Sequence, residues 1–212
     1  MNGDNAAPLC VAITGASGAP YALRLLELLL RAEQDLFLLI SSAAQVVMNT
    51  EMELRLPPTP EEIGRFLSRR FSTNPRHLRV FGQKQWAAPV ASGSSPPRAM
   101  VVCPCSMGTL SAIAHGASDN LIERAADVVI KERRRLVLVP RETPFSAIHL
   151  ENMLKLARLG VTILPANPGF YHRPESVEAL VDHVVARILD HLGVPHRLVP
   201  RWGLEKEGRE NG

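Results

Sequence analysis

The sequence is poor in cysteine, and the few cysteines that it has exclude one class of protein. Cys10, Cys103 and Cys105 are too few and too unevenly spaced for the disulfide framework of a small secreted domain. Cys103 and Cys105 flank a proline, but no second pair of cysteines and no histidine cluster completes a metal site. We therefore expect buried cysteines that pack as small apolar side chains, and no bound metal.

Aromatic residues and net charge are also scarce. Aromatic residues make up 5 % of the chain, and the formal net charge is only +3. The basic residues are scattered apart from the run at residues 133–135, and no aromatic residues alternate with them to form a stacking surface for bases. We expect solvated basic side chains and no nucleic-acid partner.

Long hydrophobic runs are missing as well. The apolar stretch at residues 25–30 is interrupted by Glu27 and is far shorter than the roughly 20 residues of a membrane span. Residues 1–7 are polar and short, unlike a secretory signal peptide. We expect a cytoplasmic protein with no membrane span.

What is present is the composition of one compact domain. The 212 residues are 46 % hydrophobic and 21 % charged, which suits a single globule with a full core. Continuous apolar runs predict strands at residues 9–14, 36–40, 99–103, 135–140 and 161–165, with a shorter apolar piece at 78–81. Caps and breakers predict helices at residues 20–32, 43–48, 59–71, 106–114, 120–132, 144–159 and 175–192.

Strands and helices therefore alternate along the chain. Strands that are apolar throughout belong to parallel sheets with helices on both faces, so we predict a single-domain, three-layer α/β sandwich. In such sheets ligands bind at the carboxyl ends of the strands. The unusual segments of the sequence lie at those ends: residues 14–19, 41–42, 103–109, 140–144 and 165–171.

The segment Thr-Gly-Ala-Ser-Gly-Ala at residues 14–19 joins a predicted strand to a predicted helix. Glycines let a ligand approach the backbone, and a helix start offers free N–H groups to a phosphate. The segment is neither Gly-x-Gly-x-x-Gly nor a P-loop, because it has two glycines rather than three and no lysine. A simple tight turn explains it equally well.

Residues 104–109 repeat this pattern, with Ser106 and Thr109 at the start of a predicted helix. Such hydroxyl groups cap helices, and they can also bind a phosphate or the edge of a heterocycle. Two segments of this kind in one sheet, together with Ser41, favour a mononucleotide site.

Four charged residues and a tyrosine are further candidates. Arg141 suits bidentate contact with phosphate and Glu142 suits acid–base chemistry, although the two also suit a surface ion pair. Lys131 ends a predicted helix, where it either complements the helix dipole or binds an anion. Arg187 lies among apolar residues of a helix and needs a phosphate or a carboxylate as partner, and Tyr171 follows a rigid turn.

Taken together, these segments resemble the flavin prenyltransferases of the UbiX type, long described as aromatic-acid decarboxylases. The resemblance rests on Thr-Gly-Ala-Ser-Gly at 14–18, Cys-Pro-Cys-Ser-Met-Gly-Thr at 103–109, Pro-Arg-Glu-Thr-Pro at 140–144 and Pro-Ala-Asn-Pro-Gly-Phe-Tyr at 165–171. It covers residues 9–202, and within the loop at 72–98 it rests on Trp86 and Ser92 alone.

The resemblance implies a flavodoxin-like (Rossmann-like) sheet in a flavin-binding domain at residues 9–202, between a flexible start at 1–8 and a polar tail at 203–212. It implies an FMN site between subunits of a homo-oligomer, a dodecamer, with no metal. The implied FMN contacts are Gly15, Ala16, Ser17, Ser41, Ser106, Met107, Gly108, Thr109 and Arg141. The implied contacts of the prenyl phosphate are Lys131, Arg141, Tyr171, Arg187, Arg124, Trp86, Ser92 and Trp202.

The implied reaction transfers a dimethylallyl group from dimethylallyl monophosphate to N5 and C6 of reduced FMN. Basic side chains would stabilise the departing phosphate, and π faces would stabilise the allylic cation. Ser17, Glu51 and Glu142 would handle protons, with Lys131 as the further catalytic residue. The product, prenylated FMN, would pass to a partner decarboxylase of ubiquinone or aromatic-acid metabolism.

Three other functions compete with this hypothesis. Flavin-dependent cysteine decarboxylases share the flavin site, but they carry Pro-Ala-Asn-Met-Asn where this chain has Pro-Ala-Asn-Pro-Gly-Phe-Tyr. Non-enzymatic flavodoxin-type electron carriers are smaller and acidic, and they need no second phosphate cluster. A direct aromatic-acid decarboxylase is the older description of the family, and the sequence by itself does not exclude it.

Overall fold

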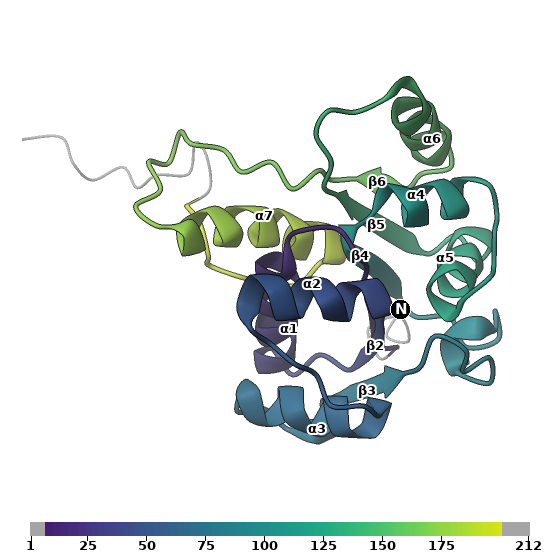
Figure 1. Cartoon of the computed structure of the whole chain (residues 1–212), viewed down its shortest axis with the longest axis horizontal. Helices are drawn as coiled ribbons and strands as arrows, with labels where there is room; N and C mark the ends of the chain where they lie inside the picture. The colour runs from purple at the N-terminus through teal and green to yellow at the C-terminus, as the bar shows by residue number, and fades with distance from the viewer. Residues whose placement is uncertain (1–6, 201–212) are drawn as a thin grey trace, which may run out of the picture.

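The computed structural model describes residues 7–200, and its centre is a parallel sheet (Figure 1). The strands run in the order β3-β2-β1-β4-β5-β6. Their bounds are β1 Leu9–Ile13, β2 Leu36–Ile40, β3 Leu78–Phe81, β4 Ala99–Cys105, β5 Arg135–Pro140 and β6 Thr162–Ile163. Every pair of neighbouring strands is parallel, as the continuous apolar runs predict.

The order of the strands reverses direction between β1 and β4. Leu9 at the start of β1 pairs with Leu36 of β2 on one side and with Ala99 of β4 on the other. The chain forms β1, β2 and β3 in turn towards one edge of the sheet. It then returns to the centre and forms β4, β5 and β6 towards the other edge. Such a switch point is the place where open α/β sheets bind ligands.

Helices cover both faces of the sheet and complete a three-layer sandwich (Figure 1). One apolar core joins the sheet to α1, α3 and α7, and the other joins it to α4, α5 and α6. Successive strand residues serve opposite cores: Val11 faces the first and Ala12 the second. The bounds are α1 Ala19–Arg31, α2 Ser42–Met52, α3 Pro60–Arg70, α4 Met107–Ala114, α5 Leu121–Lys131, α6 Ala147–Arg158 and α7 Val177–Leu192.

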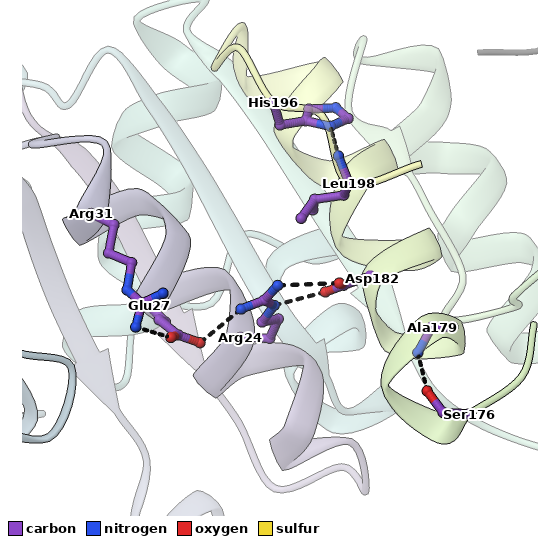
Figure 2. A network of polar contacts seen from close by, with 8 residues as sticks. All are labelled: Arg24, Glu27, Arg31, Ser176, Ala179, Asp182, His196 and Leu198. Carbon is purple, nitrogen blue, oxygen red and sulfur yellow. Dashed lines mark hydrogen bonds and ion pairs between the residues drawn. The ribbon is translucent and has the colours of Figure 1, made fainter. Parts of the chain in front are cut away.

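A bidentate ion pair fixes α7 against α1 (Figure 2). Arg24 Nε and Nη2 donate to the two carboxylate oxygens of Asp182 at 2.7 and 3.1 Å, and Arg24 also donates to Glu27 at 3.0 Å. Because Asp182 precedes His183 in the sequence, this pair sets the position of the part of α7 that carries candidate site residues.

Most helix ends lie where the sequence predicts them. The capping box of Thr59 and Glu62 begins α3, and Gly193, with φ 69°, ends α7. The helix predicted from residue 144 begins only at Ala147, because Ser146 is its N-cap and accepts the N–H of His149. The strand predicted at 161–165 is reduced to the two residues of β6, which pair with β5 alone at the edge of the sheet.

The three cysteines are buried, as predicted. Burial raises the pKa of Cys10 and of Cys103 to about 12, and burial followed by the charge of Cys103 raises the pKa of Cys105 further. These thiols are therefore inert packing groups. Among residues 7–200, no helix is long and apolar enough to cross a membrane, and no group of His, Cys, Asp and Glu side chains has the arrangement of a metal site.

Candidate functional site

Thr14 joins the ends of the two central strands. Its buried hydroxyl donates to the carbonyl oxygen of Pro104 at 2.9 Å and accepts the N–H of Ser106 at 2.8 Å. The turn that follows β1 and the turn that follows β4 are therefore held side by side at the switch point. We call this end of the sheet the carboxyl edge, and the opposite end the amino edge.

Two glycines allow the first turn its tight path. A Cβ on Gly15 would lie 2.5 Å from the Cβ of Ala43, so only glycine lets this turn approach the start of α2. Gly18 has φ 126°, a conformation that other residues rarely adopt, and it precedes α1 without a side-chain cap of its own. Gly15 thus allows close packing against α2, and Gly18 allows the backbone conformation from which α1 begins.

The cap of α1 comes from a distant residue, Glu51 of α2. Its carboxylate accepts the N–H of Gly18 at 3.0 and 3.2 Å and the N–H of Ala19 at 2.8 Å. The expectation of free N–H groups for a phosphate at this helix start is therefore wrong for these two residues. A carboxylate of the chain itself takes the place that an anionic ligand would occupy.

The same contacts keep Glu51 ionised. Partial burial alone would raise the pKa of its carboxyl group, but hydrogen bonds from Ser17, Gly18 and Ala19 and the charge of Arg141 lower it overall. Ser17 and Glu51, both predicted to act on protons, are thus brought together by the structure. Arg141 joins them, because its Nε donates to the carbonyl oxygen of Ser17 at 3.3 Å.

Glu142 follows Arg141 at the same edge but makes only local contacts in the described part of the chain. Its Oε1 accepts the N–H of Thr143 at 3.1 Å, and its side chain is half-buried. The two side chains do not form the surface ion pair that was the alternative interpretation, since no ion pair links them.

The starts of α2 and α4 differ from the start of α1, because each has its own serine cap. Ser41 accepts the N–H of Ala44 at 3.0 Å, and Ser106 accepts the N–H of Thr109 at 3.3 Å. No described residue accepts the N–H groups of Met107 and Gly108, and a Cβ on Gly108 would meet nothing within 4 Å. The start of α4 therefore combines open donors with open space, which is the arrangement that a phosphate group requires.

A second group of candidate residues lies on α5 and the loop before β4. Arg124 Nε donates to the carbonyl oxygen of Ala91 at 3.0 Å, and its Nη1 pairs with Asp127 at 2.8 Å. Trp86 is 46 % exposed, with the ammonium group of Lys84 5.8 Å from its ring centre. The loop is thus fixed to the start of α5 with its indole accessible.

Lys131 belongs to this second group because the same loop reaches the end of α5. A Cβ on Gly93 would lie 2.5 Å from Lys131 Nζ, so the segment beside Ser92 lies against this lysine. Lys131 also forms an ion pair with Glu132. Lys131 and Ser92 are close, as their shared predicted role requires.

Within this second group, Lys131 lies far from Arg141 of the same chain. Lys131 ends α5, just before β5 begins at the amino edge, whereas Arg141 follows the end of β5. The six residues of β5 span about 20 Å, so the two side chains cannot hold one phosphate in a single subunit.

A third group surrounds Tyr171, in the segment that links β6 to α7 and projects away from the sheet (Figure 1). The Tyr171 ring stands edge-on to His172 and His183 at 5.8 Å, and the two imidazoles stack at 4.9 Å with an angle of 8°. Both ring nitrogens of His172 are buried without a hydrogen-bond partner among the described residues. The spacing of the histidines in the sequence does not predict this cluster.

His183 and Arg187 complete this third group on α7. Partial burial, the neighbouring His172 and the charge of Arg187 lower the pKa of His183, so its ring is neutral at pH 7. Arg187 is exposed and pairs with Asp190 at 2.7 Å, so a carboxylate partner is present within the chain, and contact with a phosphate stays a prediction. Trp202, the remaining candidate, lies outside the described residues.

The fold defines a class, an α/β protein of flavodoxin-like architecture, and its switch point is a candidate mononucleotide site. Comparison with known proteins then identifies the family. The Flavoprotein family model matches residues 2–189. Flavin prenyltransferase UbiX of Pseudomonas aeruginosa is 62 % identical over 195 residues, which are 92 % of this chain and 93 % of that protein. Flavin prenyltransferase UbiX of Methanothermobacter thermautotrophicus is 44 % identical, over 92 % and 94 %.

Solved structures agree with this assignment. AnUbiX (PadA1) in complex with FMN and dimethylallyl pyrophosphate has a TM-score of 0.82 and 41 % identity, over 92 % of this chain and 97 % of that one. The dodecameric FMN-dependent UbiX-like decarboxylase from Escherichia coli O157:H7 has a TM-score of 0.80 and 41 % identity, over 92 % and 98 %. The chain belongs to the Flavoprotein family and, within it, to the flavin prenyltransferases of the UbiX type.

Proposed function

We propose that the protein transfers the dimethylallyl group of dimethylallyl monophosphate to N5 and C6 of reduced FMN. The observation that carries this proposal is the arrangement of the candidate residues. Anion-binding and proton-bearing side chains form three surface groups, in a chain that is 62 % identical to a flavin prenyltransferase. An electron carrier has no use for the second and third groups.

The carboxyl edge fits FMN. The open N–H groups of Met107 and Gly108 suit the phosphate, and the hydroxyl groups of Ser41 and Ser106 lie at neighbouring helix starts. We place the flavin here, against the turn at residues 15–17. Reduced FMN supplies the nucleophilic N5 and C6 atoms.

The reaction requires several protons to move. The C1–O bond of the prenyl phosphate breaks and its electrons leave with the phosphate, while N5 bonds to C1 and loses a proton. The prenyl alkene then gains a proton at C2, C6 bonds to C3, and C6 loses its proton. We assign these transfers to Ser17, Glu51 and Glu142, because Glu51 is held as a carboxylate by its hydrogen bonds and by Arg141.

The phosphate leaving group needs more positive charge than the carboxyl edge of one chain supplies. We propose that Arg141 acts together with Lys131, Arg124, Ser92 and Trp86 of one neighbouring subunit, and with Tyr171, Arg187 and Trp202 of another. Phe170, Tyr171 and Val177 are 68 %, 66 % and 69 % exposed, which supports burial of this segment against another copy. A dodecamer, as in the E. coli relative, satisfies this requirement.

The biological setting follows from the product. We propose that prenylated FMN passes to a cytoplasmic decarboxylase that uses it as a cofactor in ubiquinone or aromatic-acid metabolism. In this proposal the flavin-binding domain spans residues 9–202.

The experiment that tests the activity is a mass measurement. The protein is mixed with FMN, reduced without oxygen and given dimethylallyl monophosphate, and the flavin is then extracted. A gain of one prenyl unit is expected, and the diphosphate serves as a comparison donor. An unchanged flavin bound to an otherwise competent protein would refute the transferase and favour a flavin-dependent cysteine decarboxylase.

Mixing two inactive variants tests the shared site. Glu142→Gln damages the carboxyl edge, and Lys131→Met damages the group on α5. If different chains supply these groups, oligomers assembled from equal amounts contain about a quarter of sites with both groups intact, and activity returns. If one chain supplied both groups, every site would keep one lesion and the mixture would stay inactive.

A further inference from the structure

A cavity lies at the amino edge, away from the candidate active site. Its volume is about 650 Å³, within the usual range for small-molecule sites. It lies at the starts of β4, β5 and β6, where Ala99, Arg135 and Thr162 line it. Four arginines surround it, and we call it the arginine cavity: Arg98, Arg133, Arg134 and Arg135.

The cavity also has an apolar wall. Side chains from the ends of three helices and from the sheet form this wall: Ile130, Leu136, Leu159, Val161 and Leu192. A site of this composition suits a ligand with a negatively charged end, which the arginines bind, and an apolar end, which packs against the wall.

Three of the four arginines are not neutralised by carboxylates of the described chain. Within residues 7–200, Arg98, Arg133 and Arg135 form no ion pair, and the contacts of Arg98 and Arg135 are with the neutral side chain of Gln34 and the carbonyl oxygen of His191. Burial lowers the pKa of Arg98, and the nearby positive charge of Arg135 lowers it further.

The helix ends at the cavity explain only part of this charge. The ends of α5, α6 and α7 meet here, and arginines commonly offset the negative end of a helix dipole. Each helix end is equivalent to about half a negative charge, so three ends offset about 1.5 charges. Arg98, Arg133 and Arg135 alone carry about twice that charge, so a surplus of positive charge remains for a ligand.

We propose that the arginine cavity binds a phosphorylated small molecule with an apolar body. The phosphate carries about −1.5 to −2 charges at pH 7, which matches the surplus, and guanidinium groups bind phosphate oxygens in pairs. The apolar body lies against the wall of Ile130, Leu159 and Leu192. The length of β5 separates this site from Arg141, so it does not depend on the proposed reaction.

Calorimetric titration of the FMN-loaded, full-length protein with phenyl phosphate tests this site. We expect two binding events, one at the prenyl-phosphate groups and one at the arginine cavity. Arg133→Gln removes one guanidinium group and should weaken only the second event, by about tenfold or more. Arg133→Lys keeps the charge without the planar guanidinium group and should weaken the second event less than Arg133→Gln does. Arg70→Gln, at an exposed arginine on α3, is the control and should change neither event.

Inorganic phosphate and phenol complete the test. Phenyl phosphate should bind the cavity more tightly than either, because each lacks one half of the recognised ligand. A single binding event that Arg133→Gln does not weaken, or equal affinity for inorganic phosphate, would overturn the proposal.

Discussion

The starts of α1 and α4 lie side by side at one edge of the sheet, but a carboxylate of the described chain binds the first N–H groups of α1 and not those of α4. Each helix follows a central strand: α1 follows β1 through the turn at residues 14–18, and α4 follows β4 with Ser106 alone between them. At α1, the carboxylate of Glu51 occupies the N–H groups of Gly18 and Ala19. At α4, the N–H groups of Met107 and Gly108 have no partner among the described residues.

The difference shows that a helix start becomes an anion site only if the chain leaves it open. Ser106 caps α4 through its own side chain, whereas Gly18 offers no side-chain cap to α1. The residue that closes the start of α1 is Glu51, which lies 33 residues beyond Gly18 in the sequence. The occupied start places an ionised carboxylate beside Ser17, which suits proton transfer. The open start leaves donors for a phosphate group.

The largest effect should follow from closing the open start. Gly108→Asp places a carboxylate at the second residue of α4, where a Cβ meets nothing within 4 Å, so the fold should tolerate it. Repulsion of the FMN phosphate should weaken FMN binding by about a hundredfold, since unit charges 4 Å apart near a surface interact by about 4 kcal/mol before screening. Quenching of flavin fluorescence measures the affinity. The neutral Gly108→Asn is the matched control, and equal losses in the two variants would show a steric effect instead.

A smaller effect should follow from opening the occupied start. Glu51→Ala removes the cap of α1 and should lower the free energy of unfolding by about 1–2 kcal/mol, the usual cost of losing an N-cap. Urea denaturation at one fixed protein concentration measures this change. Gln45→Ala, at an exposed residue of the same helix, should stay within about 0.5 kcal/mol of the wild type. If both variants lost the same stability, Glu51 would not be acting as a cap.

The sequence predicts features of this molecule that depend on neighbouring residues, and it does not predict those that depend on distant ones. Strands such as β1 and β2 were predictable because their residues are apolar throughout, and the start of α3 was predictable because Thr59 and Glu62 form a local cap. Both signals lie within a few residues. The length of β6 was not predictable, because it depends on pairing with β5 alone at the edge of the sheet.

The candidate site residues also fall into two groups, those whose place follows from the predicted strand ends and those whose contacts do not. The topology of a parallel sheet places Ser41, Ser106 and Arg141 at one edge, so their neighbourhood follows from predicted strand ends. The capping of α1 by Glu51 and the stacking of His172 on His183 do not follow from them. These contacts join distant segments, and only tertiary packing decides them.

The smallest expected effect concerns the pH dependence of the occupied start. The pKa of Glu51 is lowered in the folded protein from its ordinary 4.5, so its ionised form stabilises the fold above that pH. This contribution is lost as the pH falls through the lowered pKa, because the protonated carboxyl group binds the N–H groups of Gly18 and Ala19 more weakly. Since the side chain is largely exposed, the effect should be well below about 1 kcal/mol. The stability difference between the wild type and Glu51→Gln should therefore be constant above about pH 5 and shrink towards about pH 3. A difference that does not change with pH would mean that the cap acts through its hydrogen-bond geometry and that the charge of Glu51 contributes nothing to it.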